Sequence, residues 1–158
     1  VTGGSFTEVS CMGMPSALEH LQSGNNEYNN PFGTEIALFR TSEGGVARMA
    51  VSWDTPGEGG ERGRIRTRQG TFYGEFQNGH GDGVVSELRR PPLPPGIDAG
   101  GHGGSHGYLM SEFVEAILLD RMPLVDVAQA LNMTVSGIIA HESALKDGEL
   151  MKIPQYAL

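Results

Sequence analysis

The chain has 158 residues, 38% of them hydrophobic, and a formal net charge of −8 at pH 7. This length and hydrophobic content predict a single folded domain over 1–158, and the acidic balance argues against non-specific binding to nucleic acid or to an anionic membrane surface. The single cysteine, Cys11, excludes an internal disulfide. No segment has the pattern of a membrane span or a signal peptide, and a cytoplasmic location is favoured over a periplasmic or secreted one.

Residues 1–90 have the alternating apolar and polar pattern of β-strands, interrupted by turns rich in glycine, asparagine and proline. Two pairs of these strands are close enough in sequence to form hairpins. We expect strands at 3–12, 34–40, 46–53, 62–68, 71–76 and 84–88.

The last third of the chain has helical periodicity. Ser105 is predicted to cap a helix that runs to about Asp120, after an irregular stretch over 89–104. A second helix is predicted from Met122-Pro123 to Gly148, and a short strand at 150–154. Strands followed by helices favour an α+β fold, with an open, mainly antiparallel sheet and helices packed on one face. The other sheet face is a natural dimer or domain interface.

The segment Gly100–Tyr108 is the strongest candidate for chemistry. It places His102, His106 and Tyr108 in a glycine-rich stretch that leads into the helix predicted at Ser105. Glycine lets the backbone approach a ligand, and an imidazole there can relay a proton near neutral pH. The alternative is a plain glycine loop with exposed histidines. A metal-binding histidine pair is not favoured, because the predicted helix start separates the two residues.

Two further groups are candidates for ligand contact. Trp53 and Asp54 end a strand and enter a glycine loop, where a tryptophan either stacks on a sugar ring or packs in the core. Arg62 begins a row of alternating arginines that either clamps an anion or forms a solvated face paired with acidic side chains. His141 lies on the apolar stripe of the second helix and is predicted to be a satisfied core histidine. The sequence contains no GxGxxG or Walker loop, so we expect no cofactor site in this chain. We also expect no metal site, because spacing fixes no third ligand beside the two histidines.

Four segments, in their order along the chain, resemble the C-terminal domain of the glucose–fructose oxidoreductase / inositol dehydrogenase (Gfo/Idh/MocA) family. They are Gly-Gly-Ser-Phe-Thr-Glu-Val at 3–9, Ser-Trp-Asp-Thr-Pro-Gly at 52–57, Gly-His-Gly-Gly at 101–104, and Ser-Ala … Gly … Ile-Pro within 143–154. The His-Gly-Gly loop is most similar to the branch that contains the NAD-dependent family 109 glycoside hydrolases.

The resemblance implies a domain that completes its substrate cleft with an N-terminal Rossmann domain, absent from this chain, that binds NAD or NADP. It also implies a homodimer formed through the open sheet face. His102 would be the catalytic residue. The residues implied to bind a sugar-type substrate are His106, Tyr108, Trp53, Asp54 and Arg62.

The resulting expectation is the substrate-binding and dimerisation domain of an NAD(P)-dependent sugar or cyclitol oxidoreductase, inactive alone. Two alternatives stay open at this point. One is the C-terminal domain of an NAD-dependent glycoside hydrolase, and the other is a free-standing, non-catalytic binding or assembly domain.

Overall fold

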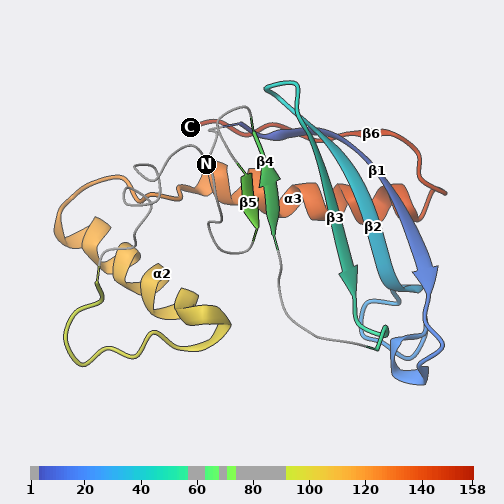
Figure 1. Ribbon diagram of the computed structural model, residues 1–158, viewed down its shortest axis with the longest axis horizontal. Helices are drawn as coiled ribbons and strands as arrows, with labels where there is room; N and C mark the ends of the chain where they lie inside the picture. Colours follow the sequence, from blue (N-terminus) through green and yellow to red (C-terminus); the bar gives the residue numbers. More distant parts are fainter. Residues whose placement is uncertain (1–3, 57–62, 68–70, 74–91) are drawn as a thin grey trace. The chain divides into compact units, whose positions relative to one another are not determined.

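A computed structural model describes residues 4–56, 63–67, 71–73 and 92–158, without the side chains of 71–73 and 102–104 (Figure 1). The chain divides into two compact units, which are described separately below. Unit 1 comprises residues 1–56 and 124–158, and unit 2 comprises residues 57–123. That the whole chain is one domain stays a prediction.

Unit 1 contains a four-stranded antiparallel sheet. Its strands are β1 (Phe6–Pro15), β2 (Phe32–Thr41), β3 (Val46–Ser52) and β6 (Met151–Lys152), in the order β3-β2-β1-β6. A short 3-10 turn, η1 (Glu19–Leu21), lies in the connection between β1 and β2. The tight β2–β3 turn places Gly44 at φ 81°, a conformation that favours glycine.

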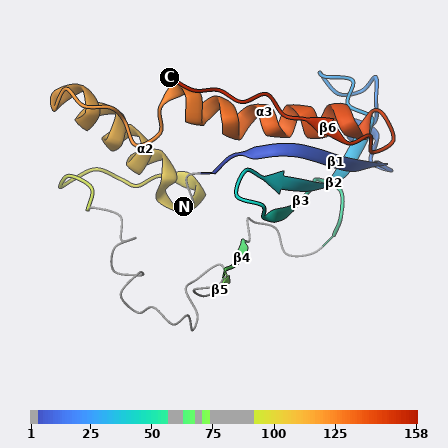
Figure 2. The same ribbon diagram turned by 90° about the horizontal axis from the view of Figure 1, so that it is seen from above.

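Helix α3 (Val127–Ala144) covers one face of this sheet, as Figure 2 shows from above. Its N-terminus is capped by Asp126, whose side chain accepts a hydrogen bond from the Gln129 amide at 2.8 Å. The helix presents alanine and serine to the sheet, which lets it approach closely. The core formed between them consists of Val9, Cys11, Ala37, Phe39, Ala140, Ala144 and Ile153.

The buried side chain of Ser143 joins three elements of unit 1. In the described part of the chain β6 pairs with β1 at Glu8 and Val9, so that beyond Val9 the edge of β1 on the β6 side has no strand beside it. The Ser143 hydroxyl accepts a hydrogen bond from the Cys11 amide at 3.0 Å and donates one to the Glu149 carbonyl at 2.6 Å. This serine therefore continues the hydrogen bonding of β1 beyond the end of β6.

In unit 2 the structure describes a two-stranded antiparallel ribbon and one helix. The ribbon pairs β4 (Arg64–Arg66) with β5 (Thr71–Tyr73), and the helix is α2 (Gly101–Leu118). Arg121 follows the helix, and its guanidinium group donates two hydrogen bonds to the Glu112 carboxylate of α2, at 2.7 and 2.9 Å. Among the described residues of both units, no helix has the length and apolar character needed to cross a membrane.

The α+β class, the antiparallel sheet and the order of its elements are confirmed. The predicted start of the first helix at Ser105 is wrong, since α2 begins at Gly101. The second helix begins at Val127 rather than Met122-Pro123, because the Asp126 cap fixes its first turn. The strand expected at 84–88 lies outside the described residues.

Candidate functional site

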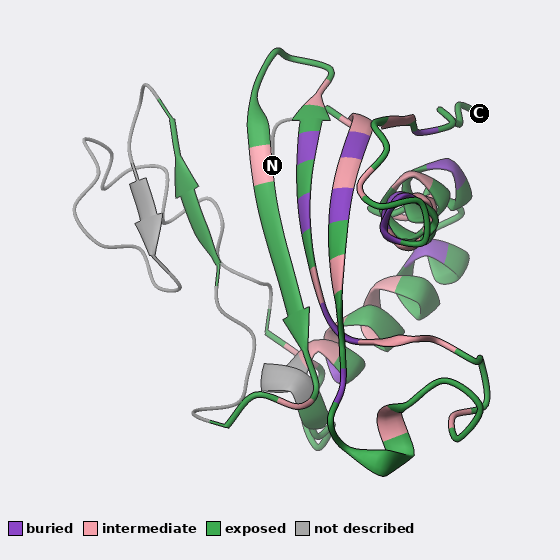
Figure 3. Cartoon of the chain, turned by 90° about the vertical axis from the view of Figure 1, so that its right-hand side faces the viewer, coloured by how far each residue is buried: buried purple, intermediate pink, exposed green. Residues whose placement is uncertain are grey.

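The face of the sheet that α3 leaves uncovered carries large apolar side chains. The pairing register places Met12 opposite Ile36, Ser10 opposite Leu38 and Glu8 opposite Arg40, all alternating with the buried residues of Figure 3. Met12, Ile36 and Leu38 are 63%, 49% and 59% exposed. We call this surface, with Met14 and Val46, the open face. Large apolar side chains gathered in the open on one sheet face are typical of a protein contact.

A charged cluster lies at one end of the open face. Glu8 accepts from Lys152 Nζ, and its other oxygen is 3.4 Å from Arg40 Nε. The hydrogen bond from Lys152, with a further contribution from Arg40, lowers the pKa of Glu8. These residues line an open hollow of about 560 Å³ beside the β2–β3 turn. Its lining combines these charged groups with the exposed Val46 of the open face.

The other end of unit 1 holds Asp54 in a set of hydroxyl groups. Its Oδ1 accepts from Thr34 Oγ1 at 2.9 Å and from Ser52 Oγ at 3.3 Å. A hydrogen bond from Ser16, the largest influence, and those from Thr34 and Ser52 lower the pKa of the Asp54 carboxyl. The adjacent Trp53 is 75% exposed. The two neighbouring residues predicted to contact a ligand therefore differ in their surroundings: the Asp54 carboxylate is hydrogen-bonded within the chain, whereas the Trp53 indole is exposed to solvent.

On the helix-covered face, His141 of α3 meets Glu35 of β2. The two side chains are joined at 2.6 Å through Nδ1 and Oε1 and are 31% and 19% exposed. The Phe32 ring lies edge-on to the imidazole, with centroids 6.1 Å apart. His141 is satisfied, as predicted, but it is half-buried rather than a core residue.

The His-Gly-Gly segment forms the first turns of α2. His106 lies beside the backbone of Gly100 and Gly101, where added Cβ atoms would come within 3.3 and 3.4 Å of its side chain. The Gly107 amide donates to the Ala99 carbonyl at 2.8 Å, and Gly107 is buried against the preceding loop. Glycine is thus required here for close packing at a helix start.

Because α2 begins at Gly101, His102 and His106 lie one helical turn apart on the same element. The predicted separation of the two histidines between a loop and a helix is therefore wrong. Within the part of the chain that the structure describes, no group of three or more His, Cys, Asp or Glu side chains is arranged to hold a metal.

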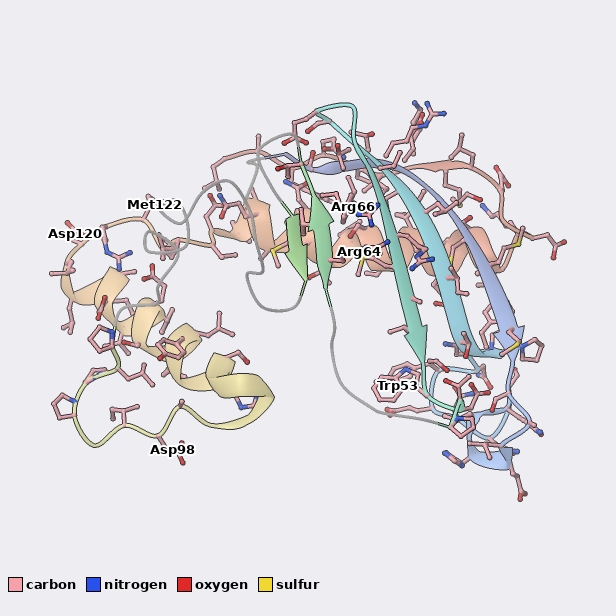
Figure 4. The ribbon with its side chains drawn as sticks, in the orientation of Figure 1. Trp53, Arg64, Arg66, Asp98, Asp120 and Met122 are labelled. Atoms are coloured by element: carbon pink, nitrogen blue, oxygen red, sulfur yellow. The ribbon has the colours of Figure 1, made fainter. Side chains whose placement is uncertain are left out.

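The structure brings together Trp53 and Asp54 in unit 1, and His102, His106 and Tyr108 on α2 in unit 2. Arg62 lies outside the described residues, while Arg64 and Arg66 are exposed on β4 (Figure 4). Sequence reasoning missed the hydroxyl groups around Asp54. The available signal was a threonine and a serine at facing ends of two predicted hairpin arms.

No protein-family model matches the sequence, and no curated protein is significantly similar to it. Solved structures do match. An oxidoreductase domain protein from Kribbella flavida has a TM-score of 0.62 at 15% identity, covering 98% of this chain and 47% of its own. A myo-inositol 2-dehydrogenase from Lactobacillus plantarum has a TM-score of 0.53 at 14% identity, covering 97% and 44%.

A scyllo-inositol dehydrogenase from Lactobacillus casei, solved with NAD(H) and scyllo-inositol, has a TM-score of 0.53 at 14% identity, covering 96% of this chain and 43% of its own. The chain has the fold of a dehydrogenase domain. This dehydrogenase-type fold agrees with the resemblance to a Gfo/Idh/MocA C-terminal domain found in the sequence. The chain spans less than half the length of these solved structures.

Proposed function

We propose that this chain is the substrate-binding and subunit-contact domain of an NAD(P)-dependent oxidoreductase that acts on a sugar or cyclitol. The observation that carries the proposal is the match of nearly the whole chain to less than half of several dehydrogenases. Such a match is expected for one domain of a two-domain enzyme. The remaining part would be a dinucleotide-binding domain, for which this sequence contains no glycine-rich fingerprint.

The proposed division of labour follows from the chemistry of carbinol oxidation. A nicotinamide held by the other domain would accept the hydride. This chain would bind and orient the ring of the substrate and take up the proton of its hydroxyl group. His102, at the start of α2, is the residue proposed to take that proton, because an imidazole is protonated and deprotonated near neutral pH. His106, Tyr108, Trp53 and Arg62 are proposed to contact the substrate, and Asp54 to act on it through the neighbouring Trp53.

The open face is proposed to bury itself against a second copy of the chain. Its exposed methionine, isoleucine and leucine side chains are costly to leave in water. The charged cluster of Glu8, Arg40 and Lys152 would form part of the polar rim. A two-fold arrangement would pair this surface with itself, which is the commonest form of homodimer.

The test uses the protein that carries this chain together with a dinucleotide-binding domain. His102→Ala should lower kcat about 10²-fold or more while leaving the Kd for NAD(P) within twofold, because the imidazole acts on the proton rather than on the cofactor. His20→Ala, an exposed histidine of η1, is the matched control and should leave both unchanged. An unaltered kcat would remove His102 from the mechanism. Release of an aglycone without net cofactor reduction would identify a glycoside hydrolase instead.

A further inference from the structure

We propose that Asp54 is a positioning residue and not a substrate ligand. In this view it fixes the backbone at Trp53, so that the exposed indole is held at one place on the sheet edge as a stacking surface for the apolar face of a ring-shaped polyol. The choice of a ring polyol rests on the proposed function. The positioning role rests on the contacts of unit 1 alone.

The Asp54 carboxylate is already occupied by hydroxyl donors of its own chain. Thr34 and Ser52 bond to its Oδ1, and Ser16 bonds to the same carboxylate. Ser16 and Thr34 are themselves only 7% and 9% exposed. A second layer ties the donors together, since Ser52 Oγ lies 2.7 Å from Thr34 Oγ1 and 2.8 Å from Thr55 Oγ1. A carboxylate bonded in this way is held in place more firmly than a free surface aspartate.

This network fixes the residue next to it. The Trp53 amide donates to the Gly33 carbonyl at 3.0 Å, which extends the β2–β3 pairing one residue past Ser52. Gly33 lies directly against Asp54, because an added Cβ would come within 2.5 Å of Asp54 Oδ2. The backbone of Trp53 is thus held on one side by the ladder and on the other by the bonded carboxylate of Asp54.

The indole itself is left largely in water. Figure 4 shows Trp53 at the end of β3, the edge strand of the sheet. A tryptophan that is 75% exposed offers most of its ring surface to a flat ligand, and the fixed backbone limits the ordering cost to the side-chain torsions. Sugar and cyclitol rings present C–H groups on a ring face and hydroxyls at the rim. The apolar indole surface complements the former, and nearby polar groups complement the latter.

The test uses the complete chain, in which Trp53 is the only tryptophan and therefore its own reporter. Asp54→Asn and Thr34→Val should lower the fluorescence anisotropy of Trp53 and increase its quenching by acrylamide. Asp98→Asn is the matched control, because Asp98 also accepts a local hydrogen bond, from Gly100, but lies in unit 2. Unchanged anisotropy and quenching in both Asp54 and Thr34 variants would overturn the positioning role.

Ligand stacking is tested by titrating the same chain with myo-inositol, with glycerol as an acyclic polyol control. We expect inositol, but not glycerol, to change Trp53 fluorescence at millimolar concentration, and Asp54→Asn to weaken this response severalfold. Saturation-transfer NMR on the Trp53→Leu variant should show loss of contact to inositol. No response in the unmodified chain would overturn the stacking role. Inositol binding that Trp53→Leu leaves unchanged would also overturn it while leaving the proposed function standing, because substrate would then bind elsewhere on the domain.

Discussion

Replacement of Ser143 by alanine should destabilise unit 1 far more than the loss of one small side chain suggests. The Ser143 side chain is fully buried and bonds both the Cys11 amide of β1 and the Glu149 carbonyl before β6. Alanine fits the same space but leaves the Cys11 donor beside the core without a partner. Each lost hydrogen bond costs about 0.5–1.5 kcal/mol, and a buried unsatisfied group about 1–3 kcal/mol. We expect a loss of about 3 kcal/mol in the free energy of unfolding.

Urea unfolding followed by Trp53 fluorescence measures this loss, because Trp53 belongs to the same unit as Ser143. In thermal unfolding, the same loss should lower the Tm of a chain of this size by roughly 6–12 °C. Ser136→Ala is the matched control on the same helix. Ser136 is also buried, but among the described residues its hydroxyl bonds only to the Met133 carbonyl of its own helix, at 2.6 Å. The Ser136→Ala variant should therefore lose less than about 1 kcal/mol of its free energy of unfolding. Equal effects of the two variants would refute the bridging role of Ser143.

Three further predictions concern the surfaces of unit 1. Gly33→Ala should displace Asp54 and increase acrylamide quenching of Trp53, because its Cβ would lie 2.5 Å from Asp54 Oδ2; unchanged quenching would contradict the close packing. The pKa of Asp54 is lowered in the folded state, so its contribution to stability is present above the usual value of 3.8 and is lost as the pH falls through the folded-state pKa. The stability difference between the unmodified chain and Asp54→Asn, measured by urea unfolding, should therefore shrink below about pH 3.8, and a difference that grows there would be inconsistent with the lowered pKa. Leu38→Glu on the open face should give monomers in sedimentation experiments where the unmodified chain gives dimers, whereas Leu145→Glu, at the exposed residue directly after α3, should not; dimers of both variants would count against the open-face interface.

The sheet could be predicted because its signals are local. Alternation over 34–40 and 46–53, with glycines at 44 and 45 between them, determines both the strands and their pairing. The boundaries of the helices were harder to predict from the sequence. Glycine at 101, 103 and 104 has low helix propensity, yet α2 begins there, because the cost of each helical glycine is only about 1 kcal/mol and the packing of Gly107 against Ala99 offsets part of it.

The candidate site could be predicted only in part, since its chemistry depends on contacts between distant residues. The sequence identifies Trp53 and Asp54 as neighbours at a strand end, but Ser16 and Thr34 reach Asp54 only through the register of three strands. The bond between Glu35 and His141 joins residues 106 positions apart, and periodicity alone shows only that His141 lies on the inner stripe of its helix. Local patterns therefore locate candidate residues, while tertiary contacts decide their roles.

We propose that this domain supplies the substrate site of a nicotinamide-dependent oxidoreductase. The most direct test is net formation of reduced nicotinamide by the protein in which this chain accompanies a dinucleotide-binding domain, assayed over a panel of cyclitols and hexoses. We expect sustained NADH or NADPH formation with at least one ring polyol, at a rate that falls sharply when this domain is altered at His102. A protein that binds the cofactor tightly yet reduces none of it with any member of the panel would contradict the claim.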